Sequence, residues 1–288
     1  MDAALTLKRA VEKKTVQSYQ EARPYLAASV LFQNLLQTFP AQPLSRLLRL
    51  SAIAEIPYAY FHPTVRLWSE ELVEQTYCGA GFSLSGEAKD LLACYNAMIV
   101  HTLLRLHSDR LVEIEKGVQW ILQYQAVARG ETCQWNEPGI QKYGGCMRSV
   151  PCYLGVVKSM LALSAAQNVF SHPQIPEKLH RGLEYILQHR VFFRLSEDTP
   201  ITKDLGKLTF PFTYKSSVLE ILRLLAENHR LDDPRCALAK DWIAQRQQKD
   251  ETWKGDRFYQ PKGWVPFEQS AWITEEIKKM NLLSPLLS

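Results

Sequence analysis

Amphipathic helical patterns recur along most of the chain, and they restrict the fold more than any other feature of the sequence. In the segment YKSSVLEILRLLAEN, apolar residues fall at Val218, Ile221, Leu222 and Leu225, which is the spacing of one helical face. Glycine and proline concentrate between such segments, and the strict alternation that marks strands is hard to find. The sequence therefore predicts an all-α fold.

A second kind of helix is apolar nearly all round. The segment YLGVVKSMLALSAA, which starts at Tyr153, has apolar residues on several rows, as is typical of a helix that packs on more than one side. Similar segments start near Leu91, Tyr214 and Glu268, at intervals of about 55 to 60 residues, which is a spacing natural for helix pairs with long loops. We expect these inner helices at 91–107, 152–167, 214–228 and 268–282.

Helices with a polar face alternate with the apolar ones and carry an internal repeat. The segments KGVQWIL, RGLEYIL and AKDWIAQ superpose, so that Trp120, Tyr185 and Trp242 coincide. Their polar faces favour an exterior position, because only the all-apolar helices lack a polar face that can be exposed to solvent. We expect these outer helices at 111–125, 177–189 and 235–248. An outer and an inner set in alternation predict a double ring of helices.

The run KGVQWILQYQAVARGETCQW resembles the Gln-Trp repeat of terpenoid cyclases, with Gln125, Gly130 and Trp135 after the aromatic and aliphatic positions. The segment WIAQRQQKDETW repeats its core with Gln247 and Trp253. Together with the closing KGWVPFEQSAWITEEIKKM, these segments make the chain similar to small bacterial squalene-cyclase-like proteins of the prenyltransferase and squalene-oxidase repeat group. The resemblance implies an α/α toroid, complete or incomplete.

The repeat pattern also sets the expected domain organisation. We expect one domain over residues 1–288, with a ring of repeats at 57–288. The segment 1–56 is helical by pattern but contains no copy of the repeat, so it adds extra N-terminal helices.

The family's catalytic motifs do not occur in the sequence. Class II terpenoid cyclases use Asp-x-Asp-Asp, because a very strong acid needs a carboxyl held neutral by its neighbours. Neither this motif, nor the Asp-Asp-x-x-Asp run of class I enzymes, nor a glycine-rich phosphate loop is found. No catalytic residue is therefore assigned, and whether the protein is an enzyme stays open.

Two classes of function follow from the resemblance and the pattern. In the first, the protein binds or acts on an isoprenoid or another apolar ligand in a central cavity; in the second, a degenerate toroid serves as a noncatalytic interaction or structural module. Aromatic residues near the starts of the inner helices suit ligand binding, although core packing explains them as well. The candidate cavity residues are Arg148, Tyr153, Tyr214, Glu268, Trp272 and His101, with Glu220 as a further acidic candidate.

Three cysteines, Cys133, Cys146 and Cys152, fall between an outer and an inner helix. Three thiolates would hold one zinc ion if the loop folds back. Free cysteine is also among the most buried residue types, so small apolar packing is the preferred interpretation, with a redox pair as a third. No cofactor is predicted, and zinc is the alternative.

The distribution of charge and hydropathy along the sequence restricts which partners and which cellular location we expect. The net charge of +4 is spread along 288 residues without a block of five or six basic residues, which argues against a nucleic acid partner. No run of about 18 uncharged apolar residues and no apolar signal segment occurs, so we expect a cytoplasmic protein without a transmembrane segment. Six cysteines in such a chain do not indicate a disulfide framework.

Overall fold

The structure, a computed structural model, describes residues 1–135, 137, 138, 150–280 and 282, and the regular structure of these residues is helical. The prediction of an all-α fold is thereby confirmed. None of the helices in this part of the chain is long and apolar enough to cross a membrane. The α-helices are α1 (Ala3–Glu12), α2 (Tyr19–Ala28), α3 (Val30–Leu36), α4 (Pro43–Ile53), α5 (Pro63–Thr76), α6 (Ala93–Arg105), α7 (Leu111–Tyr124), α9 (Tyr153–Ala166), α10 (Gln174–Gln188), α11 (Val218–Glu227), α12 (Ala237–Ala244) and α13 (Gln269–Lys279), with short 3-10 turns η1 (Ala59–Phe61), η2 (Ala88–Asp90) and η4 (Pro234–Cys236).

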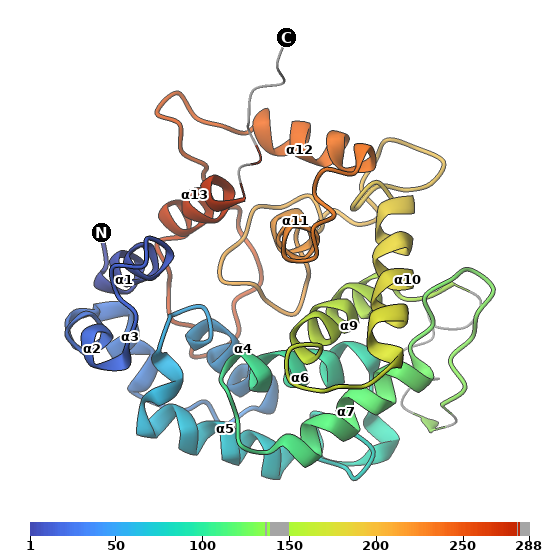
Figure 1. Cartoon of the computed structure of the whole chain (residues 1–288), viewed down its shortest axis with the longest axis horizontal. Coiled ribbons are helices and arrows are strands. Elements are labelled where there is room, and N and C mark those ends of the chain that lie inside the picture. The colour runs from blue at the N-terminus through green and yellow to red at the C-terminus, as the bar shows by residue number, and fades with distance from the viewer. Residues whose placement is uncertain (136, 139–149, 281, 283–288) are drawn as a thin grey trace.

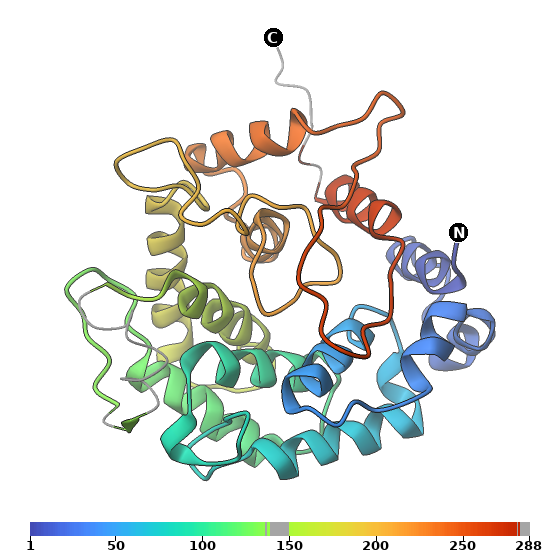
Figure 2. The same ribbon diagram turned by 180° about the vertical axis from the view of Figure 1, so that it is seen from behind.

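The helices alternate between an inner and an outer position along the chain. Helices α4, α6, α9 and α11 lie toward the middle of the molecule, and α5, α7, α10 and α12 lie around them (Figure 1). The view from behind gives the same order (Figure 2). Helix α13 lies beside α1, so the first and last helices of the described chain are neighbours.

Glycines of the repeat allow the outer helices to pack closely on the inner ones. A Cβ added to Gly182 of α10 would lie 2.0 Å from the sulfur of Met160 on α9. One added to Gly117 of α7 would lie 2.5 Å from a methyl group of Val100 on α6. Only a residue without a side chain fits at this distance, so the repeated glycine is explained by helix packing.

The later part of the repeat folds back onto the outer helix. The ring of Trp135 packs edge-on against Trp120 of α7, with 5.9 Å between the ring centroids. The indole N–H of Trp253 donates a 2.8 Å hydrogen bond to the carbonyl of Ile243, near the end of α12. An isolated β-bridge joins Trp253 to Gln247, and similar bridges follow α5 and α10. The aromatic positions of the repeat are therefore packing positions.

The observed helix bounds agree with the expected ones to within a few residues, apart from two. Helix α11 begins at Val218 and not at Tyr214, because the Ser217 hydroxyl caps it by accepting the Glu220 N–H at 3.4 Å. Tyr214 therefore lies in the loop before the helix. Helix α12 is shorter than the expected 235–248, because η4 precedes it and Gln247 already pairs with Trp253.

Ion pairs join the N-terminal and C-terminal helices. The Arg9 guanidinium of α1 donates to the Glu275 carboxylate of α13 at 2.6 Å, and Lys279 lies 3.2 Å from Glu12. The Lys8 ammonium also pairs with Glu276. Apolar side chains of both helices belong to the same buried core. The segment 1–56 thus supplies α1 to α4, of which α4 lies in an inner position.

Candidate functional site

Two adjoining pockets lie where the inner helices begin. Each has a volume of about 490 Å³, and Asp204, Tyr214 and Lys215 line both. The first pocket also has lining residues from α4 and the start of α6 and from the loops before α11 and α13, among them Leu44, Leu48, Tyr95, Lys207, Phe258 and Tyr259. The second has lining residues from the starts of α9 and the end of α10, among them Cys152, Tyr153, Tyr185 and His189. Pockets of this size and apolar character are typical of small-molecule sites.

Tyrosine side chains form the walls of both pockets. The rings of Tyr95 and Tyr214 stack with 5.4 Å between their centroids. Burial raises the pKa of the Tyr95 hydroxyl, and the neighbouring Tyr214 adds to the rise. In the second pocket the Tyr153 hydroxyl donates to the backbone carbonyl of Val191. Burial raises the pKa of Tyr153 well above its ordinary value, so these phenols are neutral walls and not acids or bases.

His189 lies at the end of α10, between two of these tyrosines. Its ring contacts Tyr153 and Tyr185 edge-on, with centroid distances of 5.3 and 5.0 Å. The Nδ1 atom lies 3.0 Å from the carbonyl of Phe193; because a carbonyl only accepts, Nδ1 carries the proton. Among the residues that the structure describes, none forms a hydrogen bond with the buried Nε2. Burial lowers the pKa of His189, so the imidazole is neutral.

A small cavity with charged side chains in its walls lies in the middle of the described part of the molecule. This cavity has a volume of about 30 Å³, enough for water but not for an apolar chain. Its walls come from the ends of α4 and α6, from α9 and α11, and from the loop before α11. The lining residues include Glu55, His101, Arg105, Lys158, Glu220 and Arg223.

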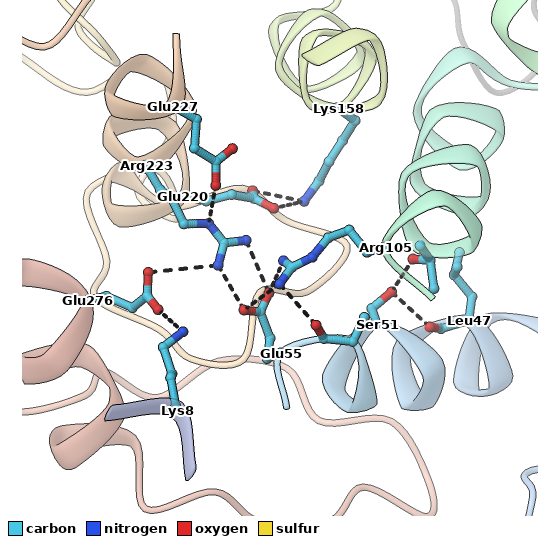
Figure 3. A network of polar contacts seen from close by, with 12 residues as sticks. Lys8, Leu47, Ser51, Glu55, Arg105, Lys158, Glu220, Arg223, Glu227 and Glu276 are labelled. Atoms are coloured by element: carbon cyan, nitrogen blue, oxygen red, sulfur yellow. Dashed lines mark hydrogen bonds and ion pairs between the residues drawn. The ribbon is translucent and has the colours of Figure 1, made fainter. Parts of the chain in front are cut away.

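Glu55 is the centre of the buried ion-pair network. Its carboxylate accepts hydrogen bonds from Arg105 at 2.7 Å and from Arg223 at 2.8 and 3.0 Å. Figure 3 shows the carboxylate between the two guanidinium groups. Burial alone would raise the pKa of Glu55, but the two arginines hold it well below its ordinary value. The glutamate is therefore ionised at neutral pH.

A second buried pair lies across the cavity from the first. The Lys158 ammonium of α9 donates to both Glu220 oxygens of α11, at 2.7 and 2.8 Å, and to the carbonyl of Thr213 at 2.8 Å. Both side chains are only 4% exposed. With its three donor positions occupied, Lys158 fixes α9 against α11 and the loop that leads into it.

His101 lines the same cavity from α6. Its pKa lies well below the ordinary value, because burial disfavours the charged form and the Arg105 and Arg223 charges oppose protonation further. Its imidazole is neutral at physiological pH. A general base at this position would have no room for a substrate in a cavity of about 30 Å³.

The structure separates the residues that the sequence grouped as cavity candidates. Tyr153 and Tyr214 line the larger pockets, and His101 and Glu220 line the central cavity. Trp272 is 1% exposed and stacks on Phe210 in the core, with 5.0 Å between ring centroids. Glu268 is exposed at the N-terminal end of α13. Arg148 lies outside the described residues.

Several residues of these sites were not found by sequence reasoning. Glu55 and Arg223 depend on contacts between distant segments, which no local pattern reveals. His189 follows Tyr185 of the repeat by four residues, a helical spacing that would have placed the two side chains on one face. Asp204, Lys207 and Lys215 lie in a loop whose charges look like ordinary solvated residues in the sequence.

The cysteines do not form a recognisable metal centre in the described part of the chain, where no group of three His, Cys, Asp or Glu side chains is placed to hold an ion. Cys133 is partly buried, which raises its pKa, and Cys152 lines the second pocket. Burial raises the pKa of the neighbouring Cys94 to about 12, with a smaller effect from Cys152. Cys146 lies outside the described residues.

Comparison of the chain with known proteins does not assign it to a family. No protein-family model matches the sequence, and neither the curated proteins nor the solved structures contain a match. The geometry of the two pockets and of the central cavity is therefore the basis for assigning a function.

Proposed function

We propose that the protein is an α/α toroid that binds a small apolar molecule, an isoprenoid or a compound of similar character, at the end of the ring where the inner helices begin. The main support for this proposal is the position of Tyr214, because its side chain lines both pockets of about 490 Å³. The toroid interpretation is supported by the alternation of inner and outer helices and by the contact of α1 with α13.

The chemistry of the pocket walls favours an apolar ligand. Tyr95, Tyr153, Tyr185 and Tyr214 provide large aromatic surface, and burying such surface against a ligand is favourable by roughly 25 cal/mol per Å². The central cavity of about 30 Å³ does not take part, so the ligand lies at the rim and not in the ring centre expected from the sequence.

A noncatalytic interaction module is the second candidate, and the central ion pairs favour it. A ring centre occupied by Glu55, Arg105 and Arg223 is a rigid connection between helices, and the cavity that the described residues form there has a volume of only about 30 Å³. In this case the pockets at the rim would be unoccupied hollows, and partner proteins would bind the outer surface.

Binding of farnesol tests the two candidates against each other. Titration calorimetry should detect farnesol binding to the wild type, and Tyr214→Ala should weaken it by about tenfold or more, because an aromatic wall of both pockets is lost. Tyr25→Ala is the matched control, since this tyrosine lies on α2 and lines neither pocket. Absence of farnesol binding, together with native mass spectra that contain only the bare chain mass after purification from its own cells, would favour the interaction module.

A further inference from the structure

We propose that the ligand of the two pockets carries a negatively charged head group, which binds at Lys215 and Lys207 where the pockets meet, while its apolar chain lies among the tyrosines. The inference rests on the proposed function, because it names the chemical class of ligand for the same site. A long-chain carboxylate is the simplest molecule of this class.

The charged groups at the junction are held together by one carboxylate. The Lys207 ammonium donates to Asp204 Oδ1 at 2.7 Å, and the Lys215 ammonium pairs with the other oxygen of Asp204. The two lysines lower the pKa of Asp204, so it is ionised at neutral pH. These contacts close the loop from 204 to 215 onto itself and fix the three charges at one place in the wall.

The charges at this junction do not cancel. Among the described residues that line either pocket, the carboxylate of Asp204 faces two ammonium groups, while the remaining side chains are neutral. One positive charge is left over beside two pockets of aromatic and aliphatic character. The local potential therefore favours an anion over a neutral or cationic ligand.

The junction of the two pockets is partly exposed, so a charged head group can bind there without being buried. The side chains of Asp204, Lys207 and Lys215 are 25%, 33% and 55% exposed, so a charged group that binds there stays in contact with water. Tyr214 lies next to Lys215 in the chain and lines both pockets, so a chain attached to that head group meets aromatic surface at once. Such a site avoids the large cost of burying a charge and still buries the chain.

A series of ligands with one chain and three head groups provides the test. Dodecanoate, 1-dodecanol and dodecyltrimethylammonium are titrated into the 288-residue chain at neutral pH, the two ionic compounds below their micellar concentrations and dodecanol below its solubility limit. We expect dodecanoate to bind about fivefold to tenfold more tightly than dodecanol, the range typical of a charge-assisted contact at a partly exposed site. The ammonium compound should bind most weakly, and the preference should decrease as salt is added.

Substitutions of the charged residues at the junction test which side chains cause the preference for dodecanoate over dodecanol. Lys215→Met should reduce dodecanoate affinity to that of dodecanol and leave dodecanol binding unchanged, and Lys215→Arg should restore the preference. Asp204→Asn should increase dodecanoate affinity, because it removes the competing carboxylate. Lys249→Met is the matched control, since Lys249 is exposed and lines neither pocket.

Equal binding of the three compounds would overturn the head-group inference and leave the proposed function in place. Stronger binding of the ammonium compound, or a Lys215→Met protein that keeps the dodecanoate preference, would also overturn it. If none of the three binds to the wild type while farnesol does, the head-group inference fails and the proposed function stands. If farnesol does not bind either, both fail. Lys215 is 55% exposed, so its variants should fold, and an unchanged melting temperature verifies this.

Discussion

The guanidinium of Arg223 donates two hydrogen bonds, of 2.8 and 3.0 Å, to the carboxylate of Glu55, from which it is separated by 168 residues in the chain. Both side chains are more than nine-tenths buried. The pair therefore connects α11 to the end of α4 through the middle of the molecule, and it provides the most direct stability tests.

Replacement of Glu55 by Gln should destabilise the protein strongly. The change leaves the buried Arg223 and the partly buried Arg105 with a neutral partner, and the loss of one member of a buried ion pair costs about 3 to 5 kcal/mol. Urea denaturation measures the free energy of unfolding. Glu227→Gln is the control, because that carboxylate is 52% exposed and lies 3.8 Å from Arg223, so its loss should cost less than about 1 kcal/mol. Similar losses for the two variants would contradict the central role of Glu55.

The same carboxylate should make stability depend on acid pH. Because the folded-state pKa of Glu55 is lowered, its contribution is present above its unfolded pKa and is lost as the pH falls through the folded pKa. Unfolding measured between pH 7 and pH 3 should show the difference between wild type and Glu55→Gln decreasing toward low pH. A difference that stays constant over this range would mean that Glu55 is not ionised in the folded protein.

His101 should destabilise the folded protein at a higher pH than Glu55. Its folded-state pKa is lowered, so below its unfolded value of about 6.5 the unfolded chain binds a proton that the folded chain does not. Stability should therefore fall as the pH decreases from about 6.5 to 5, and His101→Gln should fall less steeply. Parallel slopes for the two proteins would show that His101 does not contribute.

Gly182→Ala should destabilise the protein although alanine is the better helix former. The added methyl group would overlap the Met160 side chain, which is fully buried, and overpacking of this kind costs about 1 to 3 kcal/mol. The double variant Gly182→Ala/Met160→Ala should lose less stability than the sum of the losses of the two single variants, because the overlap is gone. Full additivity would show that α10 already has room for a side chain at this position.

Trp120→Ala should cost about 3 to 5 kcal/mol, as other truncations of large core residues do. The indole is 2% exposed and contacts both Trp135 and Tyr124. Leu67→Ala on α5 is a surface control, because Leu67 is 54% exposed. A loss for Trp120→Ala below about 1 kcal/mol, near that of the control, would contradict a packing role for the repeat.

Local patterns in the sequence were sufficient for the helices but not for the sites. The periodicity that places Val218 and Ile221 on one face also places α11, and only the Ser217 cap shifts its start. Glu55 follows an ordinary amphipathic helix, and its significance depends on Arg223, far away in the chain. Side chains from separate helices define both pockets as well, so their shape depends on how the helices pack and not on any one segment.

The pairing of α1 with α13 determines when this contact can form during synthesis and folding. Arg9 and Glu275 are separated by 266 residues, so their contact has to wait until nearly all of the described chain has been synthesised. Until then Lys8, which is 6% exposed in the finished protein, has no Glu276 to pair with and stays hydrated. Contacts between such distant segments also slow folding, because much chain entropy is lost before they form. Closure of α1 against α13 therefore follows the synthesis of α13, whereas the pairs of inner and outer helices, which are close in sequence, can form earlier during translation.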